Sequence, residues 1–408
     1  MRRSTRREKV PACYLHAGRS ISIVLVVGIA ACSPGGTGNP SKPPADSGFV
    51  LDASLDLDGQ AFDPAKDNDG DGYLFADDCD DRNPEVNPGA FDVPGDRVDN
   101  DCNGKIDDVE ECDTVPLKLE STDAMDFARA IGLCRTAKVD ATGKDKHWGV
   151  LDAKIVRADG IGAPNPVQFG LMQRFGSWVN PRAGRNFAVL SSGTARTPSS
   201  TQWVAPKDPS FATPSVVVPP PGWPRNTIGC PAPFDKSAND SVNLKLTIRV
   251  PSNANAFSFD FDFYSSEYIT YVCSQYNDTF VALLNAKTSM NPTFGGNICL
   301  DNLNNPINVN SGFFEVCTPG TSKSGTKYGC PKGIAELAGT GYWNDASPQD
   351  HGATSWLQTK APLVPGETIT IQFMIWDTGD HFLDSTVLLD NWQWDVKGTT
   401  GPETGRPR

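Results

Sequence analysis

The chain has 408 residues, of which 36 are Lys or Arg and 49 are Asp or Glu, and its formal net charge is −13. The acidity is local, because residues 52–113 carry 21 acidic and four basic side chains while the rest of the chain beyond residue 31 is close to neutral. A carboxylate cluster of this density repels itself unless cations neutralise it. It also argues against a nucleic-acid partner, because phosphates need a basic surface.

The first 31 residues have the pattern of an export signal. A basic stretch precedes the apolar run Ile21–Ile29, which is too short to cross a bilayer as a helix. The run leads into Ile29-Ala30-Ala31-Cys32, which resembles a bacterial lipobox, and the resemblance implies that Cys32 is lipidated and anchors the protein in a membrane. Ser33 replaces the aspartate associated with inner-membrane retention, so the resemblance favours the outer membrane or cell surface. Ordinary signal cleavage near an Ala-x-Ala site and an intact helical anchor remain alternatives.

The rest of the sequence divides into four segments. Residues 32–66 begin with the lipidated cysteine and are rich in Pro, Gly, Ser and Asp, which predicts a flexible tether. Residues 67–113, here called the acidic segment, form a small calcium-binding module. Residues 114–397 form a larger domain, and residues 398–408 are predicted as a disordered tail.

The acidic segment contains two calcium-loop patterns in tandem. Each puts oxygen-bearing side chains at loop positions 1, 3, 5 and 12 and glycine at position 6, a spacing that suits Ca²⁺ and its oxygen ligands. With backbone or water-mediated ligands at positions 7 and 9, the predicted metal ligands are Asp67, Asp69, Asp71, Tyr73 and Asp78 in the first loop and Asp99, Asp101, Asn103, Lys105, Asp107 and Glu110 in the second. Asp78 stands where a bidentate glutamate is usual, and Asp77, Asp80 and Asp81 offer substitutes. We expect an affinity of roughly 10⁻⁴–10⁻³ M; a solvated acidic linker with chance spacing is the alternative.

Few large apolar side chains occur in the acidic segment, so we expect metal and disulfide bonds to supply stability that a core does not. Prolines next to the loops leave little room for the flanking helices of an EF-hand. Four motifs stand out: Asp67-Asn-Asp-Gly-Asp-Gly-Tyr73, Asp78-Cys-Asp-Asp81, Asn87-Pro-Gly-Ala90 and Asp99-Asn-Asp-Cys102. On these residues the segment resembles thrombospondin type-3 and dockerin-like repeats, and more closely a metal-binding repeat of large bacterial surface proteins.

Nine cysteines follow Cys32, and in an exported chain they indicate disulfide bonds. We predict the pairs Cys79–Cys102, Cys112–Cys134 and Cys317–Cys330 and leave the remaining connectivity open. Because nine is odd, one thiol is left free, is buried or pairs between chains.

Residues 114–397 predict a mainly β domain. One helix is expected over Ser121–Leu133, with Ser121 or Thr122 as its N-cap. Short alternating or β-branched runs then predict strands over 150–156, 186–190, 244–250, 257–263, 280–284, 368–375 and 385–389. Many short strands without interleaved helices indicate an antiparallel β-sandwich, of the jelly-roll kind, with long loops.

Four motifs in this domain carry a second resemblance: Phe187-Ala-Val-Leu-Ser-Ser-Gly-Thr194, Phe257–Tyr268, Tyr276–Leu284 and the acidic stretch Asp377–Asp390. Together, and in this order, they resemble the choice-of-anchor L family of bacterial exported proteins. The resemblance implies a β-sandwich displayed on a cell surface through an anchor that varies between members, and it implies no activity.

Acidic residues near the strand ends form a possible second metal or ligand site, comprising Glu267, Asn277, Asp278, Asp377, Asp380, Asp384 and Asp390. The alternative is that these side chains only hydrogen-bond loop backbone. A catalytic set is not expected: Asp260 and Asp262 alternate with phenylalanines and are predicted to point outward, and no histidine lies in a known catalytic motif.

Three tryptophans near the last strands, Trp376, Trp392 and Trp394, are expected to fill the core, with a sugar-stacking platform as the alternative. The sequence therefore predicts a lipid-anchored, Ca²⁺-binding surface protein whose β-sandwich serves adhesion or binds a polysaccharide or a surface protein. A purely structural envelope protein and a calcium-dependent hydrolase are the alternative hypotheses.

Overall fold

The structure, a computed structural model, describes residues 63–407 apart from residues 64, 116, 208–210, 212, 232–235, 289–294 and 344–350. The predicted signal peptide, Cys32 and most of the predicted tether lie outside the described residues. Within the described ranges, no helix combines the length and the apolar character needed to span a bilayer.

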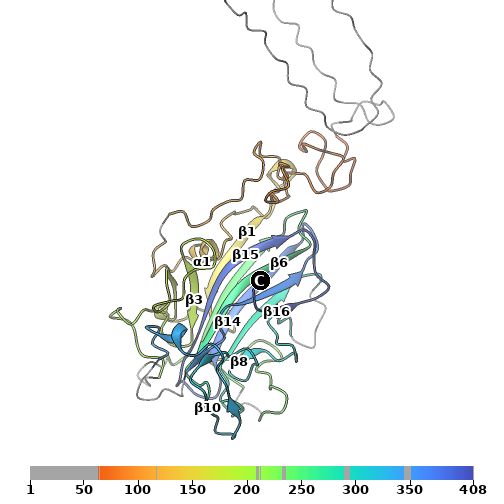
Figure 1. The fold of residues 1–408 in the computed structure, drawn as a ribbon. Helices are drawn as coiled ribbons and strands as arrows, with labels where there is room; N and C mark the ends of the chain where they lie inside the picture. The colour runs from red at the N-terminus through yellow and green to blue at the C-terminus, as the bar shows by residue number, and fades with distance from the viewer. Residues whose placement is uncertain are drawn as a thin grey trace, which may run out of the picture. The chain divides into compact units, whose positions relative to one another are not determined.

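Two antiparallel sheets dominate the described part of the chain (Figure 1). The first sheet has the order β1-β5-β14-β7-β8, with β4 beside β5. Its strands are β1 (Gly149–Val156), β4 (Val216–Val217), β5 (Ala238–Arg249), β7 (Thr279–Asn285), β8 (Ile307–Asn308) and β14 (Thr368–Asp377).

The second sheet has the order β16-β13-β6-β15-β3-β2, and β12 pairs with both β6 and β9. Its strands are β2 (Phe169–Met172), β3 (Phe187–Ser191), β6 (Ala256–Ser265), β9 (Val316–Cys317), β12 (Gly352–Ala353), β13 (Leu357–Pro362), β15 (Ser385–Asp395) and β16 (Glu403–Gly405). The remaining elements are the hairpin β10 (Gly320–Thr321) and β11 (Lys327–Tyr328), the helix α1 (Ala124–Ala130) and the 3₁₀ turns η1 (Gly143–Asp145), η2 (Pro166–Gln168) and η4 (Ala335–Leu337).

The two sheets pack face to face through aromatic rings. The alternating phenylalanines of β6 are fully buried in the shared core. Phe259 lies 4.9 Å from Phe373 of β14, and Phe261 lies 5.1 Å from Phe280 of β7, measured between ring centroids. Burying each such ring contributes about 1.5–3 kcal/mol. The predicted antiparallel β-sandwich is therefore confirmed.

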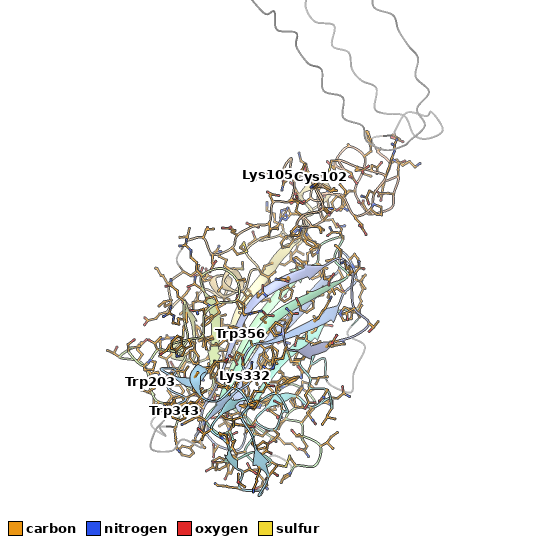
Figure 2. All side chains as sticks on the ribbon, viewed as in Figure 1. Cys102, Lys105, Trp203, Lys332, Trp343 and Trp356 are labelled. Carbon is orange, nitrogen blue, oxygen red and sulfur yellow. A yellow bond between two sulfur atoms is a disulfide. The ribbon has the colours of Figure 1, made fainter. Side chains whose placement is uncertain are left out.

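The opposite face of β6 is covered, which corrects the prediction that Asp260 and Asp262 point into solvent. Both carboxylates are fully buried, because a second apolar cluster packs on this face, including Tyr264 and Tyr342. Long loops before β3 and after η4 supply most of this cover, and Trp343 and Trp356 pack against it (Figure 2). The alternation along β6 correctly predicts the face that packs on the other sheet, but alternation does not reveal a third layer.

The helix α1 is shorter than the predicted range Ser121–Leu133. Asp123, rather than Ser121 or Thr122, is the N-cap, and its carboxylate accepts a hydrogen bond from the N–H of Met125 at 3.0 Å. The Ser121 hydroxyl instead accepts the N–H of Asp123 at 3.2 Å, so it fixes the residue before the helix. Capping chemistry two residues further along therefore sets the true start.

Disulfide bonds and the C-terminus complete the fold. The predicted pairs Cys79–Cys102, Cys112–Cys134 and Cys317–Cys330 are confirmed, and Cys230 pairs with Cys273. Cys299 is the buried free thiol among the described residues.

The predicted disordered tail, residues 398–408, is instead partly a strand. β16 pairs with β13, and the hydroxyls of Thr404 and Thr359 lie 2.8 Å apart. The Arg406 guanidinium forms an ion pair with Glu315 at 2.7 Å. Pairing satisfies backbone groups that β13 would otherwise leave open at the sheet edge, a benefit that a short polar sequence does not signal.

Candidate metal centre

The acidic segment packs on the sandwich. Tyr73 is buried, with its ring against Gly89 and its hydroxyl donating to the Lys146 carbonyl. The N–H of Phe91 donates to the side-chain oxygen of Asn253 at 3.0 Å, and the Asn253 amide returns a bond to the Phe91 carbonyl at 2.9 Å. A segment too poor in apolar residues to form its own core thus uses the surface of its neighbour.

The first loop gathers its predicted side-chain ligands. Oxygens of Asp67, Asp69 and Asp71 lie within 4.8 Å of one another, and so do oxygens of Asp69, Asp78 and Asp81. The Asp67 carboxylate also accepts the N–H groups of two loop glycines at 2.6 and 2.9 Å, which closes the turn. Asp78, at loop position 12, is shorter than the usual glutamate. The Asp81 carboxylate lies beside it and can supply the additional oxygen ligand.

Unpartnered oxygens show that this loop fits a cation. One carboxylate oxygen each of Asp69, Asp71 and Asp78 is buried without a hydrogen-bond partner among the described residues. Burial, followed by neighbouring carboxylates, raises the pKa of Asp71 to about 6 and that of Asp78 to about 7. Orphaned oxygens in a self-repelling cluster suit a hard cation that takes oxygen ligands.

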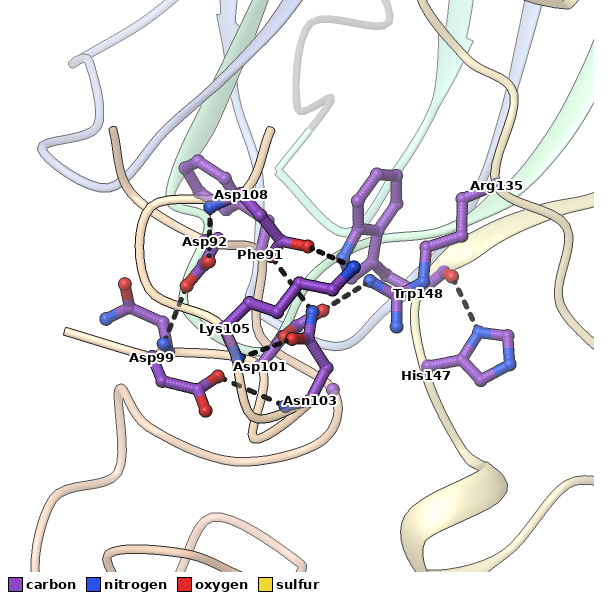
Figure 3. A network of polar contacts seen from close by, with 12 residues as sticks. Phe91, Asp92, Asp99, Asp101, Asn103, Lys105, Asp108, Arg135, His147 and Trp148 are labelled. Atoms are coloured by element: carbon purple, nitrogen blue, oxygen red, sulfur yellow. Dashed lines mark hydrogen bonds and ion pairs between the residues drawn. The ribbon is translucent and has the colours of Figure 1, made fainter. Parts of the chain in front are cut away.

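The second loop gathers a different set, shown in Figure 3. Oxygens of Asp92, Asp99 and Asp101 lie within 4.8 Å of one another. The Asp99 carboxylate accepts the N–H groups of Asn103 at 3.1 Å and Gly104 at 2.8 Å, in the same manner as Asp67 in the first loop. One oxygen of Asp101 has no partner in the described part of the chain.

Two predicted side-chain ligands of the second loop lie away from this cluster, whereas the predicted carbonyl ligand Lys105 stays a prediction. Glu110 is exposed. Asp107 accepts two backbone N–H groups of residues 95–97 at 2.9 and 3.1 Å. The structure brings in Asp92 instead, whose pKa is raised by burial. A twelve-residue pattern cannot signal Asp92, because it precedes the loop in sequence.

Two covalent links hold the loops in place. The disulfide Cys79–Cys102 joins the residue after Asp78 to the residue after Asp101, so it ties the end of the first loop to the start of the second. Its sulfurs are therefore not metal ligands. Cys112–Cys134 ties the end of the acidic segment to the chain beyond α1.

A cavity of about 380 Å³, here called the tryptophan cavity, lies beside the second loop. Its lining includes Trp148, Trp392 and Trp394 together with Asp92 and Asp101. The indole N–H groups of Trp148 and Trp392 are buried and have no partner within the described ranges. The cavity thus combines aromatic faces with carboxylates of the second loop.

The tryptophan predictions divide. Trp392 is buried in the shared core, and Trp376 is buried in a separate apolar cluster with Trp223 and Met374, as expected. Trp394 is half-buried and lines the cavity, with its ring 5.2 Å from that of Trp392. The sequence did not single out Trp148, which directly precedes β1. Its ring packs against that of Trp394 in β15, and it thereby completes the aromatic lining.

The predicted second site is partly assembled. Asp390 lies apart from the other members: it accepts the N–H groups of residues 182, 183 and 391, and burial raises its pKa to about 7. The other six residues, here called the end cluster, lie where β6 and β14 end and where β7 and β15 begin. They are Glu267, Asn277, Asp278, Asp377, Asp380 and Asp384.

Two family models match the chain. The family described as "Putative metal-binding motif", whose model is labelled copper-binding, matches residues 78–108, and the Choice-of-anchor L domain family matches residues 234–393. No curated protein matches the chain. A solved structure of the enzymatically active domain of tailspike protein 4 from Bacteriophage CBA120 covers 61% of this chain and 19% of that chain, with 8% identity and a TM-score of 0.19, a likeness too weak to carry an argument. The two family matches indicate a surface protein: the chain carries a metal-binding motif followed by a choice-of-anchor L domain.

Proposed function

We propose that the protein is a calcium-binding surface protein, held at the outer membrane by a lipidated Cys32, whose tryptophan cavity binds polysaccharide. One observation carries this proposal: the second loop and the cavity share Asp92 and Asp101. A cation held by the loop would therefore set the charge and the position of one cavity wall. The proposal goes beyond the family matches, which support a metal-binding surface protein.

The donor atoms favour calcium over copper. The clustered donors in both loops are carboxylate oxygens, whereas copper sites prefer imidazole, thiolate or thioether ligands. The sulfurs of Cys79 and Cys102 are bonded to each other. The Nδ1 atom of His147 lies 3.0 Å from the Trp148 carbonyl rather than among the carboxylates (Figure 3).

A chain of direct contacts connects the loop to the cavity. Asp101 has one unpartnered oxygen for a cation, and its other oxygen accepts a hydrogen bond from Arg135 at 2.8 Å. The Arg135 guanidinium lies over the Trp148 ring, 5.1 Å from its centroid. Because a bound cation would hold Asp101, it would also hold Arg135 and the indole face that lines the cavity.

The cavity's chemistry favours a carbohydrate over a protein ligand. Sugar rings present apolar faces that stack on tryptophan and hydroxyls that bond to carboxylates. The cavity offers both kinds of group, and its volume of about 380 Å³ fits a small unit of a longer chain.

The binding test uses the mature chain and a panel of bacterial and host polysaccharide fragments, with titration calorimetry in calcium and in chelator. We expect binding in calcium that weakens on chelation, and a loss of about tenfold or more on Trp394→Ala. Trp178→Ala is the matched control, because Trp178 is 67% exposed and does not line the cavity. Binding that is insensitive to both Trp394→Ala and chelation would contradict the proposal, and so would silence across the panel.

The anchor is tested separately by palmitate labelling of the full chain in its host and by fractionation. Labelling should be lost in Cys32→Ser and kept in Cys13→Ser, since Cys13 precedes the apolar run. Equal labelling of the two variants would contradict anchoring through Cys32.

A further inference from the structure

The end cluster lies at one end of the sandwich, where strands of both sheets terminate together. In the second sheet β6 pairs with β15 so that Ser265 faces Ser385. In the first sheet β14 pairs with β7 so that Trp376 faces Thr279. Asp384 adjoins the first pair and Glu267 lies two residues beyond it, while Asp278 and Asp377 adjoin the second pair. Strand pairing thus brings together four carboxylates that are up to 117 positions apart in sequence.

These carboxylates are buried, which is unusual for charged groups. Glu267, Asp278, Asp377 and Asp384 are each no more than 2% exposed. Buried carboxylates are stable only when they are paired, hydrogen-bonded, protonated or bound to metal. The cluster therefore requires some compensating partner.

The hydrogen bonds in the described ranges leave several oxygens of the cluster unsatisfied. Both carboxylate oxygens of Asp377 and one of Asp278 are buried without a donor that satisfies them, and the two carboxylates lie against each other. The neutral oxygens of Asn277 and Thr378, each in a side chain at most 3% exposed, are also unpartnered. Glu267 does have a partner, since its carboxylate accepts the N–H of Asp278 at 3.1 Å.

The carboxylates are close enough to influence one another. After burial, the charge of Asp278 is the largest cause that raises the pKa of Asp377, and Asp384 and Glu267 contribute in the same direction. The pKa of Glu267 is raised by burial and then by Asp278 and Asp380. Neighbouring carboxylates rather than cationic side chains thus dominate the local field after burial.

A glycine makes room for one member of the cluster. A Cβ atom at Gly193 would lie 1.9 Å from a carboxylate oxygen of Asp384, so a larger residue there would force this carboxylate to move. Gly193 follows β3, the strand beside β15 in the second sheet. The backbone is thus shaped around an acidic side chain that points into the protein.

We infer that the end cluster is a second cation site, in which the Asp278 and Asp377 carboxylates bind a divalent cation of the calcium class inside the sandwich while Glu267 and Asp384 add negative charge around it. Among the described residues, the groups of three carboxylates with oxygens within 4.8 Å of one another all lie in the acidic segment. The inferred shell therefore also uses neutral oxygens, and those of Asn277 and Thr378 are available. Such a shell, made only of oxygen atoms, suits a hard cation of flexible coordination number.

This site is more deeply buried than the loops of the acidic segment, and its cation should therefore exchange with solvent more slowly. High ligand charge and a rigid setting both tighten calcium binding. The loops lie nearer the surface, with Gly70, Gly72 and Gly104 exposed, and they should empty in chelator, whereas the buried site should keep its ion. Its ion would join the two sheets at the end where they have no backbone pairing with each other.

Elemental analysis of the purified mature chain tests the site. After exchange into chelator and then metal-free buffer, we expect about one equivalent of cation per chain to remain. The retained ion should be lost in Asp377→Asn and kept in the loop variant Asp71→Asn. The control Asp262→Asn, at another fully buried carboxylate, should also keep it. Absence of a retained ion in the wild-type chain, or its retention in Asp377→Asn, would overturn the inference.

Thermal unfolding provides a second readout with opposite signs. If a cation neutralises the cluster, Asp377→Asn removes a ligand and lowers the Tm in calcium. If the carboxylates only share protons, the amide relieves repulsion and raises the Tm in calcium and chelator alike, which would overturn the inference. If Asp377→Asn fails to fold, Asn277→Ala provides a milder test, because it removes only a neutral oxygen. We expect Asn277→Ala to weaken retention of the ion. Unchanged retention in both Asn277→Ala and Asp278→Asn would count against the site.

Discussion

Replacing Arg135 with methionine tests whether the second loop is coupled to the sandwich. Methionine keeps much of the apolar stem while it removes the guanidinium that bonds to Asp101 and lies over Trp148. The Asp101 side chain is 4% exposed and that of Arg135 is 25% exposed. In chelator the variant thus leaves a buried carboxylate without its partner, beside two other carboxylates.

The magnitude follows from this burial. Breaking a fully buried ion pair costs about 3–5 kcal/mol, and the partial exposure of Arg135 reduces this to about 2–3 kcal/mol. In saturating calcium the cation compensates Asp101, so the loss should fall to about 1 kcal/mol, mainly from the lost contact with Trp148. The calcium-induced gain in the free energy of unfolding should therefore be larger in the variant than in the wild-type chain.

Urea unfolding followed by tryptophan fluorescence, in calcium and in chelator, measures both quantities. Arg129→Met is the control, because Arg129 pairs with Asp126 of α1 and not with a loop carboxylate, and it should cost no more than about 1 kcal/mol in either condition. An equal loss for Arg135→Met with and without calcium would refute the coupling between the cation, Asp101 and the cavity.

Three further predictions concern stability. Burial raises the pKa of Asp262 to about 7, so the folded protein keeps a proton that the unfolded chain loses above about pH 4. The free energy of unfolding should therefore fall by up to about 4 kcal/mol as the pH rises from about 4 to 7. Urea unfolding should show this pH dependence, and the dependence should be weaker in Asp262→Asn. Gly89→Ala places a Cβ atom 1.9 Å from the Tyr73 hydroxyl, so limited proteolysis should cut the acidic segment faster than in the wild-type chain, whereas Gly312→Ala, with open space at its Cβ position and no positive φ, should have a much smaller effect. Replacing Cys79 and Cys102 by alanine opens a loop with a sequence separation of 23 and should cost about 3 kcal/mol in chelator, with part of the loss recovered in calcium; no loss in calorimetric unfolding would argue against the disulfide as a brace.

The strands were predictable because their signal is local. Each predicted strand is present, and the alternation of phenylalanines in Phe257–Phe263 correctly identified the face that packs on the other sheet. The same alternation failed for Asp260 and Asp262, because the loops that cover them come from distant parts of the sequence. Burial of a polar face depends on tertiary packing that a period of two does not encode.

The candidate sites show the same division. Fixed spacing within one loop identified Asp67, Asp69 and Asp71, which the structure brings together. The sequence did not predict Asp92 or Trp148, because both lie outside the twelve-residue pattern of the second loop. Folding places Asp92 among the carboxylates of that loop and Trp148 in the cavity next to it. The members of the end cluster lie at strand ends whose pairing the order of motifs suggested, and their role as a ligand site stays a prediction.

Hydrogen–deuterium exchange of the acidic segment, in millimolar calcium and in chelator, tests the central claim most directly. The N–H groups of Gly70, Gly72 and Gly104 bond to the first carboxylate of each loop, and they report on loop closure. We expect slower exchange across residues 67–113 in calcium, extending to Trp148 through Arg135, with no comparable change in strands β5 and β14. Identical exchange of residues 67–113 in the two conditions would contradict the claim that calcium organises this segment against the sandwich.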